Sequence, residues 1–381
     1  MRISPKRIGI LGGGQLGKMM ALAAGNWHMP VAILDRDRDY PAGPWATPFV
    51  CGDFKIKDEV YTFGKKMDVL TYEIEQVNLE ALYSLEEEGI SVYPRASTLK
   101  IIQDKGIQKT FYQEKHIPTA PFQLYGNKEA IQQAIQKGTL SVPFVQKTRK
   151  DGYDGRGVTV IREERDLTHL LEGPCVVEKT IAIRQEISIL VARSVSGAIC
   201  TYEPVEQFFD PLTNLVSYLI CPAQAEASVL QTMDRIARQL AIELNLTGLL
   251  AVEFFVDAKG DVYVNEVAPR PHNSGHHTQN SCDTSQFEQH LRAIMDLPLG
   301  SVRQHSVGAM VNLIGEPGHA GPARFLGLDE CLALPGVHVH LYGKKETRPG
   351  RKMGHINICQ HDREEVLEKM TLVREVAKVV T

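Results

Sequence analysis

The chain has 381 residues, which is long enough for two or three domains with substantial cores. Its composition is that of an ordinary globular protein, with 43% hydrophobic and 23% charged residues. A formal net charge of −4 argues against a general nucleic-acid-binding protein, and no apolar run is long enough to cross a membrane. The N-terminal residues show no signal-peptide pattern, and the seven cysteines are scattered singly. We therefore expect a cytoplasmic protein with reduced thiols.

The first 95 residues or so alternate short apolar strands with helices. We predict strands at 7–11, 31–35, 68–73 and 90–93, and helices from the glycine-rich turn to Trp27 and over 79–88. Alternation of this kind is typical of a mostly parallel sheet with helices on both faces.

A glycine-rich turn follows the first predicted strand. Gly12, Gly14 and Gly17 match G-x-G-x-x-G between a strand and a helix, and Asp35 ends the next strand. The pattern resembles a dinucleotide fingerprint, in which backbone N–H groups approach a phosphate at a helix N-terminus. It favours a nicotinamide oxidoreductase, but the same turn could bind another polar ligand or merely allow a tight bend.

The domain boundaries are predicted from breaks in the helical pattern. Ser97 can cap a helix running to about Lys115, after which two prolines interrupt it. We expect a first boundary near 105–118 and a second near 298–306. The predicted domains are 1–108, 109–298 and 299–381.

A second glycine-rich loop lies between predicted strands at 142–147 and 158–161. The first strand delivers Lys147, and the loop that follows carries Arg156 and three glycines in six residues. Exposed N–H groups beside two cations suit a triphosphate, although this is not a Walker A loop, whose lysine lies inside the glycine motif before a helix. The alternative is a flexible hairpin tip with basic residues for solubility.

The strand at 175–181 ends in charged residues and leads into a connecting segment. Such an edge can offer backbone N–H and C=O groups to an adenine base, although nothing in these residues demands it. We expect a further strand at 186–191 and an amphipathic helix at 227–244.

The stretch from Gly248 to Ala268 is typical of a β-hairpin, with two apolar runs around a turn at 257–261. If Val256 opposes Tyr263, then Glu253 stands opposite Glu266, with Cβ atoms roughly 5 Å apart. A buried carboxylate pair needs a proton or a cation, and Mg²⁺ prefers carboxylate oxygens together with water and phosphates. The alternative is a solvated edge with two unrelated glutamates, and a bulge in the turn would shift the register.

The segment after the hairpin is polar and contains three histidines. His272, His276 and His277 could suggest zinc, but Pro271 and Gly275 argue against the helix that would bring two of them onto one face. We prefer an anion-binding role together with Arg270.

The C-terminal part is predicted to hold strands at 307–314, 337–342 and 355–359, followed by a helix from about 364. A strongly basic segment at 344–355 lies between two of these strands. Arginine and lysine side chains that project from such a loop suit a phosphomonoester. The alternative is a solvent-exposed turn, which is the more common structure for a run of charged residues.

Taken together, a glycine loop, a strand lysine ahead of it, an adenine-type linker and a carboxylate pair on a downstream hairpin resemble the ATP-grasp fold. The match narrows to the N5-carboxyaminoimidazole ribonucleotide synthetase family and covers essentially the whole chain. The segments that carry it are GGGQLGKM, TYEIEQV, KTRKDGYDGRG, VVEKTI, VEFF with VNEVAPRPHNSGHHT, and RPGRKMGHI. The resemblance implies an ATP-grasp fold with an N-terminal doubly wound parallel-sheet domain and a small C-terminal β-rich domain.

The resemblance also implies a reaction. Members of this family join bicarbonate to 5-aminoimidazole ribonucleotide with ATP, through carboxyphosphate, giving ADP, phosphate and N5-carboxyaminoimidazole ribonucleotide in purine biosynthesis. It implies ATP and Mg²⁺ as cofactors, small-molecule substrates, no nucleic-acid or membrane partner, and a homodimer.

Site residues are carried over by motif. ATP contacts are expected from Lys105, Lys147, Gly152, Tyr153, Asp154, Gly155, Arg156, Gly157, Val158, Glu178, Lys179, Thr180, Ile181, Glu186, Asn265 and Glu266. Glu253 and Glu266 are expected to hold Mg²⁺, and Arg270 and His272 to bind bicarbonate or carboxyphosphate. The ribonucleotide is expected to contact Gln15, Leu16, Glu73, Tyr153, Asp154, Arg156, Lys344 and Arg351, with Lys344 also counted among the catalytic residues.

Two positions depart from the family pattern. Asp151 stands where the family usually has glycine, and Phe209 stands where members often have a histidine that can donate a hydrogen bond. The first change can stiffen the loop or alter its charge, and the second puts a nucleotide contact at that position in doubt.

Three alternatives stay open. They are another ATP-grasp ligase, such as a formate-dependent glycinamide ribonucleotide transformylase or a biotin carboxylase; a nicotinamide oxidoreductase; and a non-catalytic nucleotide sensor.

Overall fold

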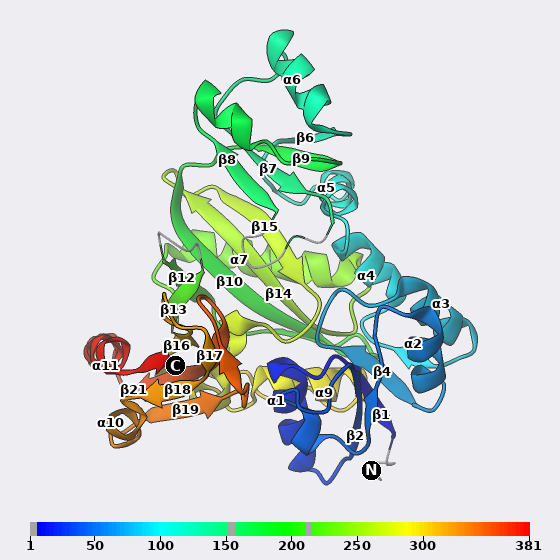
Figure 1. Ribbon diagram of the computed structural model, residues 1–381, viewed down its shortest axis with the longest axis vertical. Helices are drawn as coiled ribbons and strands as arrows, with labels where there is room; N and C mark the ends of the chain where they lie inside the picture. The colour runs from blue at the N-terminus through cyan, green and yellow to red at the C-terminus, as the bar shows by residue number, and fades with distance from the viewer. Residues whose placement is uncertain (1–5, 151, 153–156, 211–214) are drawn as a thin grey trace.

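The computed structural model describes residues 6–150, 152, 157–210 and 215–381. Figure 1 shows a parallel sheet at the N-terminal end, a long central sheet, a smaller sheet above it, and C-terminal strands that extend the central sheet on the other side. Within the described residues, no helix is both long and apolar enough to span a bilayer.

The N-terminal sheet is parallel throughout, as the alternation of strands and helices predicts. Its five strands lie in the order β3-β2-β1-β4-β5. They are β1 (Ile8–Leu11), β2 (Val31–Asp35), β3 (Phe49–Cys51), β4 (Val69–Tyr72) and β5 (Ser91–Val92). Strands β1, β2 and β4 are buried along their whole length, which explains why they read as continuous apolar runs.

The two faces of this sheet are covered by helices from different parts of the chain. One face packs against α2 (Lys57–Gly64), α3 (Leu79–Glu87) and α4 (Ala96–Ile102). The other packs against α1 (Gln15–Gly25) and α9 (Gln286–Ile294), the latter through Phe287, Leu291 and Ile294. The N-terminal core is therefore completed by a helix that lies almost 200 residues downstream of this sheet.

The predicted helix from Ser97 to Lys115 is wrong, because the structure divides it into α4 and α5 (Lys105–Glu114). The Asp104 carboxylate caps α5 by accepting hydrogen bonds from the N–H groups of Gly106 and Ile107. The same carboxylate is held by Arg149 at 2.7 Å, just ahead of the second glycine loop. This cap places Lys105 at the start of α5.

A four-stranded antiparallel sheet carries the second glycine loop. Its order is β6-β9-β7-β8. The elements are β6 (Phe122–Tyr125), α6 (Lys128–Gln136), β7 (Phe144–Thr148), β8 (Val158–Ile161), η2 (Glu164–His169) and β9 (Cys175–Lys179). Figure 1 shows this sheet at the top of the molecule, above the central sheet.

The central sheet has nine strands and runs across the predicted boundary at 298. Its order is β15-β14-β10-β12-β13-β16-β21-β19, with β11 paired to β10. Its strands are β10 (Ile183–Arg193), β11 (Ile199–Thr201), β12 (Val205–Phe209), β13 (Val216–Cys221), β14 (Gly248–Asp257), β15 (Val262–Ala268), β16 (Val307–Ile314), β19 (Val337–Leu341) and β21 (Lys352–Gln360). Because β13 pairs with β16, the C-terminal strands continue the same sheet.

The remaining elements lie mostly around the central sheet, while η1 packs beside α1 in the N-terminal domain. Helix α7 (Ala227–Glu243) packs against β10 and β14 in the largest apolar core. The others are η1 (Gly43–Trp45), η3 (Asn273–Gly275), α8 (Thr278–Ser281), β17 (Gly321–Pro322), β18 (Arg324–Leu326), α10 (Leu328–Leu332), β20 (Glu346–Thr347), α11 (Arg363–Val376) and β22 (Lys378–Val380). The basic segment at 344–355 contains β20 and the start of β21, so it is not one solvated turn.

The hairpin formed by β14 and β15 has a register that differs from the prediction at its turn. Val256 opposes Val262, so its predicted pairing with Tyr263 is wrong. The register shifts by one residue at Asn265, between the pairs that involve Phe254 and Glu253. This bulge restores the predicted pairing of Glu253 with Glu266.

Candidate active site

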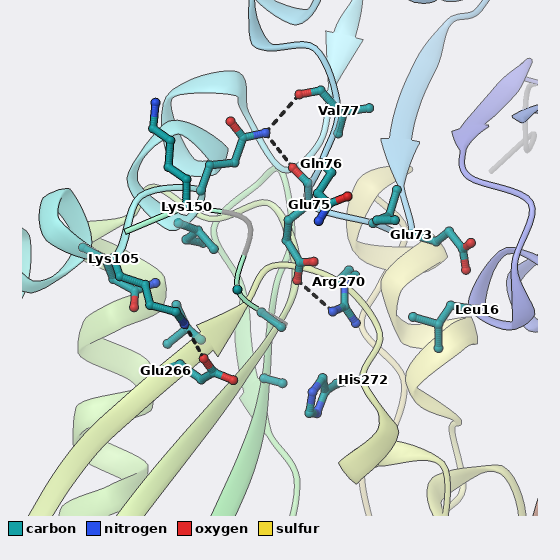
Figure 2. A pocket seen from close by; sticks show the side chains of 18 of the residues that line it. Leu16, Glu73, Glu75, Gln76, Val77, Lys105, Lys150, Glu266, Arg270 and His272 are labelled. Atoms are coloured by element: carbon teal, nitrogen blue, oxygen red, sulfur yellow. Dashed lines mark hydrogen bonds and ion pairs between the residues drawn. The ribbon is translucent and has the colours of Figure 1, made fainter. Parts of the chain in front are cut away.

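A cavity of about 860 Å³ lies where the three predicted domains meet. Figure 2 shows charged side chains converging on it from several segments. The lining side chains discussed below are Gln15, Leu16, Glu73 and Glu75 from the N-terminal domain, Lys105 and Arg149 near α5 and the glycine loop, Glu253, Glu266, Arg270 and His272 from the hairpin and the loop after it, and Lys352 from β21.

The carboxylate pair occupies one wall of the cavity. Directly paired residues share a face of the sheet, so Glu253 and Glu266 point to the same side. Burial, together with the charge of Glu266, raises the pKa of Glu253. The Lys105 ammonium lies 2.7 Å from Glu266 and lowers the pKa of that carboxylate (Figure 2). The two acids are thus unequal, because among the described residues a lysine pairs with Glu266 but none pairs with Glu253.

The donor set around Glu253 fits a hard divalent cation. The Ser188 hydroxyl lies opposite Glu253 on β10 and is buried with no hydrogen-bond partner in the described structure. The candidate ligand atoms are the carboxylate oxygens of Glu253 and Glu266 and the Ser188 hydroxyl, and Mg²⁺ prefers oxygen over the nitrogen and sulfur ligands typical of zinc. No cluster of three or more histidine, cysteine, aspartate or glutamate side chains with ligand geometry occurs among the residues described. A cation here therefore needs oxygens from a bound phosphate to complete its shell.

Two further lysines stand behind this wall. Lys147 on β7 donates to the Asn265 side chain at 2.9 Å and contacts the Glu178 carboxylate at 3.0 Å. Lys109 on α5 contacts the other oxygen of Glu178 at 2.8 Å. The Glu178 side chain therefore lies inside, between two lysines, so only its backbone can face a base at the end of β9. Burial opposes ionisation of Glu178, but these two lysines hold its pKa below the usual value.

Lys109 was missed by the sequence reasoning. Burial lowers its pKa to about 8. The signal was present, because Lys109 lies four residues after Lys105 on the same helix and so shares its face.

The predicted adenine and ribose contacts lie at the joint between the two sheets. The Lys179 N–H donates to the Pro121 carbonyl, and β9 ends there, just before Thr180 and Ile181. Glu186 on β10 shares a sheet face with Glu253, and burial raises its pKa to about 7.

The root of the second glycine loop is described, although most of the loop is not. The Thr148 N–H donates to the Gly157 carbonyl at 2.8 Å, which closes the loop where β7 and β8 meet. Gly157 has a φ of +73°, and Val158 pairs with Lys147 across β7 and β8. Gly152 lines the cavity. Asp151, Tyr153, Asp154, Gly155 and Arg156 lie outside the described residues.

The N-terminal glycine turn already holds two carboxylates. The N–H groups of Gly14 and Gly17 donate to the two oxygens of Glu73, at 2.5 and 2.9 Å. The Gly13 N–H donates to Asp35 at 2.6 Å. Burial raises the pKa of Glu73 to about 7 in spite of its two N–H donors. The donors that would bind a pyrophosphate are thus occupied by side chains of this chain, which argues against a dinucleotide.

The residues expected to bind the ribonucleotide fall into two sets. Gln15, Leu16 and Glu73 line the cavity together. Lys344 and Arg351 do not line it: the Lys344 ammonium donates to the Lys352 carbonyl, and Arg351 donates to the Glu346 carbonyl. From the same basic segment, Lys352 reaches the cavity. The sequence offers no local signal for this difference, since the strand register decides which lysine faces inward.

Arg270 enters the cavity close to the N-terminal domain. Its Nη2 lies 2.8 Å from the Glu75 carboxylate, and its Nη1 donates to the Pro271 carbonyl. Its Nε is buried with no hydrogen-bond partner within the part of the chain that is described. Glu75 was missed by the sequence reasoning, because its pairing with Arg270 spans almost 200 residues.

His272 is fixed in one tautomer by its own loop. Its Nδ1 accepts the Ser274 N–H at 3.3 Å, so the ring proton of the neutral imidazole is on Nε2. That Nε2 points toward Glu253, at 3.8 Å. The buried Gln286 side chain bonds both the N–H and the carbonyl of His272, at 2.8 and 2.7 Å. His272 therefore presents a hydrogen-bond donor to the cavity.

Comparison of the sequence with known proteins shows which family has these features. Three family models match the chain: the ribonucleotide synthetase preATP-grasp domain over residues 5–103, the ATP-grasp domain over 110–287, and the phosphoribosylaminoimidazole carboxylase C-terminal domain over 308–369. The N5-carboxyaminoimidazole ribonucleotide synthase of Bacillus subtilis is 38% identical over 96% of this chain and 94% of its own. The chain belongs to the N5-carboxyaminoimidazole ribonucleotide synthase family.

Solved structures agree with this assignment. The Thermotoga maritima N5-carboxyaminoimidazole ribonucleotide synthetase is 40% identical over 99% of each chain, with a TM-score of 0.91. The Aspergillus clavatus enzyme, solved with ADP and 5-aminoimidazole ribonucleotide, is 28% identical, with a TM-score of 0.89 over 98% of this chain and 99% of its own. The ATP-grasp fold and the ligase class predicted from the sequence are confirmed.

As a member of the N5-carboxyaminoimidazole ribonucleotide synthase family, the chain is an ATP-dependent carbon–nitrogen ligase of purine biosynthesis. The nicotinamide oxidoreductase alternative is therefore wrong. The geometry gives the physical reason: a Cβ added to Gly14 would lie 2.4 Å from a Glu73 oxygen, so the turn is closed around that carboxylate.

Proposed function

We propose that this protein converts 5-aminoimidazole ribonucleotide, bicarbonate and ATP into N5-carboxyaminoimidazole ribonucleotide, ADP and phosphate. The observation that carries the proposal is a single cavity lined by both sets of residues, Glu253 and Glu266 from the hairpin and Gln15 and Glu73 from the N-terminal domain. Figure 2 shows Glu266 and Glu73 well apart, with Arg270 between them. The Aspergillus relative, solved with ADP and 5-aminoimidazole ribonucleotide, gives the chemical identity of the ligands.

ATP is held between the four-stranded sheet and the central sheet. Lys105 and Lys147 contact its phosphates, and the loop from Gly152 to Val158 covers them. The end of β9, from Glu178 to Ile181, holds the adenine through backbone groups, and Glu186 contacts the ribose. On binding, the Lys105 ammonium exchanges its contact with Glu266 for one with phosphate.

Glu253 and Glu266 hold Mg²⁺, with Asn265 beside them on the bulge. When bound, the cation neutralises charge on the ATP phosphates during transfer. The side chains of this chain supply the rest of the electrostatic environment, because Lys105 and Lys147 are already fixed at that wall.

Bicarbonate needs activation, because hydroxide is a poor leaving group. A bicarbonate oxygen attacks the γ-phosphorus, ADP leaves, and carboxyphosphate forms. The exocyclic amine of the ribonucleotide then attacks the carbon, either on carboxyphosphate or on CO₂ released from it, and phosphate leaves while the nitrogen loses a proton. Arg270 and the Nε2–H of His272 orient the bicarbonate and stabilise its developing charge.

The ribonucleotide lies beside Gln15, Leu16 and Glu73. Tyr153, Asp154 and Arg156 stay predicted contacts on the covering loop, and Lys344 and Arg351 stay predicted contacts of its phosphate. Lys352 is the cation of that segment which lines the cavity. We assign it to the anionic intermediates and leave the phosphate to the two predicted side chains.

The compartment and the assembly follow from the same family. We propose a cytoplasmic homodimer. The cytoplasmic assignment is supported by seven cysteines that are all unpaired, as expected for a reducing environment. Light scattering at several protein concentrations tests the dimer, and a constant monomer mass would contradict it.

The proposed reaction is tested by coupled ADP release, with each substrate omitted in turn. We expect release to require ATP, bicarbonate and 5-aminoimidazole ribonucleotide together. Stimulation by glycinamide ribonucleotide and formate instead would assign the chain to a different ATP-grasp ligase. A nucleotide sensor would bind ATP without turnover under every condition.

A further inference from the structure

Arg270 is one of several cations that line the cavity, and two contacts hold its guanidinium: the Glu75 carboxylate on Nη2 and the Pro271 carbonyl on Nη1. Arginine side chains have several rotatable bonds, so an unanchored guanidinium samples several positions. Here the Nη2 contact with Glu75, at 2.8 Å, is the only ion pair recorded for Arg270 among the described residues. Because the guanidinium is planar, fixing this nitrogen also fixes the direction of the buried Nε–H, which has no protein partner in the described structure.

Glu75 is itself held by the chain that surrounds it. The Gln103 amide donates to the carbonyls of Glu75 and Val77, at 2.6 and 3.0 Å. Figure 2 shows these two bonds above the Glu75 carboxylate, which points down toward Arg270. Gln103 immediately precedes Asp104 and Lys105, the cap and the first residue of α5. The loop that carries Glu75 is therefore tied to the junction that positions the ATP-binding lysine.

A purely structural role does not account for this pair. Both side chains line the cavity, and they are 18% and 27% exposed. Ion pairs of this kind contribute little net stability, since the cost of desolvation offsets the attraction. The pair also joins two parts of the site: Glu75 lies two residues after Glu73, at the ribonucleotide side, and Arg270 lies four residues after Glu266, at the ATP side.

The geometry points to Glu75 as a positioning residue that aims Arg270 at bicarbonate and couples this arginine to the ribonucleotide loop. The inference rests on the proposed function. Glu75 does not contact the reacting atoms; it acts through Arg270. The opposite role, in which Glu75 occupies the arginine and competes with bicarbonate, predicts an effect of opposite sign.

The test measures initial rates of ADP release against bicarbonate, with ATP and 5-aminoimidazole ribonucleotide saturating. For Glu75→Gln we expect the bicarbonate KM to rise about ten- to a hundredfold, with the KM for ATP unchanged. Glu75→Asp keeps the charge on a shorter arm, so we expect it to recover part of the loss. Glu87→Gln, at the exposed end of α3, is the matched control for charge and is expected to behave as wild type.

A double-mutant cycle separates positioning from general damage. In an Arg270→Met background, Glu75→Gln is expected to change the bicarbonate KM by less than about twofold, because the cation it acts through is gone. Equal effects of Glu75→Gln in both backgrounds would overturn the inference. So would an unchanged or lowered bicarbonate KM in the single variant.

Different outcomes would overturn the proposed function and the positioning role of Glu75. If the wild-type protein releases ADP without any need for bicarbonate, the proposed function is wrong, and the inference falls with it. If the wild-type protein requires bicarbonate and Glu75→Gln does not affect it, the inference alone falls. Thermal unfolding midpoints of all the variants confirm that each one is folded at the assay temperature.

Discussion

The hairpin that carries Glu253 and Glu266 and the glycine turn that holds Glu73 are both places where charge is concentrated, yet they are arranged in opposite ways. At the hairpin, one carboxylate is paired with the Lys105 ammonium and the other faces an orphan hydroxyl, so the wall is prepared for a cation and phosphates. At the turn, the N–H groups that could bind an anion are already bound to carboxylates of the chain. The first is an open site, and the second is a closed structural motif.

The difference shows why local glycine patterns mislead. The turn has the residues of a dinucleotide fingerprint, but Glu73 lies 59 residues after Gly14 and supplies the anion itself. The spacing of glycines predicts that backbone N–H groups are available to bind an anion. It does not predict whether a side chain from a distant part of the chain already accepts those hydrogen bonds, as Glu73 does here.

The largest effect is expected when a charge is removed at the open site, the hairpin that carries Glu253 and Glu266. For Glu266→Gln we expect kcat to fall about a hundred- to thousandfold, because the charge that balances the cation during phosphoryl transfer is lost. Steady-state ADP release measures this. Asp261→Asn, an exposed acid in the turn of the same hairpin, is the matched control. Wild-type turnover in Glu266→Gln would contradict the metal assignment.

A smaller effect is expected at the phosphate lysines. Lys147→Gln should raise the KM for ATP about tenfold or more, since a charge-assisted contact to phosphate is lost. The same change also leaves Glu178 with Lys109 as its remaining lysine partner. Lys150→Gln is the comparison, because Lys150 also lines the cavity but forms no ion pair with Glu178 or Glu266 among the described residues. Its KM for ATP should rise less than that of Lys147→Gln.

Much of this site could be predicted from the sequence, although partly through compensating errors. The pairing of Glu253 with Glu266 is correct, but the predicted turn is one residue out of register, and the bulge at Asn265 cancels that error. That Lys352 lines the cavity, while Lys344 and Arg351 do not, depends on a strand register that the basic run does not reveal. The break between α4 and α5 depends on Arg149, which lies 45 residues from the aspartate it holds.

The glycine turn that holds Glu73 can be tested through the pH dependence of the protein's stability. The pKa of Glu73 in the folded chain is about 7, above its usual value of 4.5, because burial disfavours the charge. The unfolded chain therefore loses this proton first as pH rises. The stability of the wild-type protein relative to Glu73→Gln should fall between pH 4.5 and 7, by no more than about 3 kcal/mol.

Chemical denaturation of both proteins across this pH range gives the difference in the free energy of unfolding. A difference that grows with pH would mean that the two N–H donors outweigh burial. In that case Glu73 would be a stabilised carboxylate, and the claim that burial sets its pKa would be wrong.

The central claim is that bicarbonate is activated at the open site by transfer of the γ-phosphoryl group. Bicarbonate labelled with ¹⁸O tests it directly, with ATP and 5-aminoimidazole ribonucleotide present. Because a bicarbonate oxygen attacks phosphorus and stays with it when the carbon leaves, we predict one labelled oxygen in the phosphate released per turnover, measured by ³¹P NMR or mass spectrometry. Phosphate without label, formed as fast as ADP, would contradict the account.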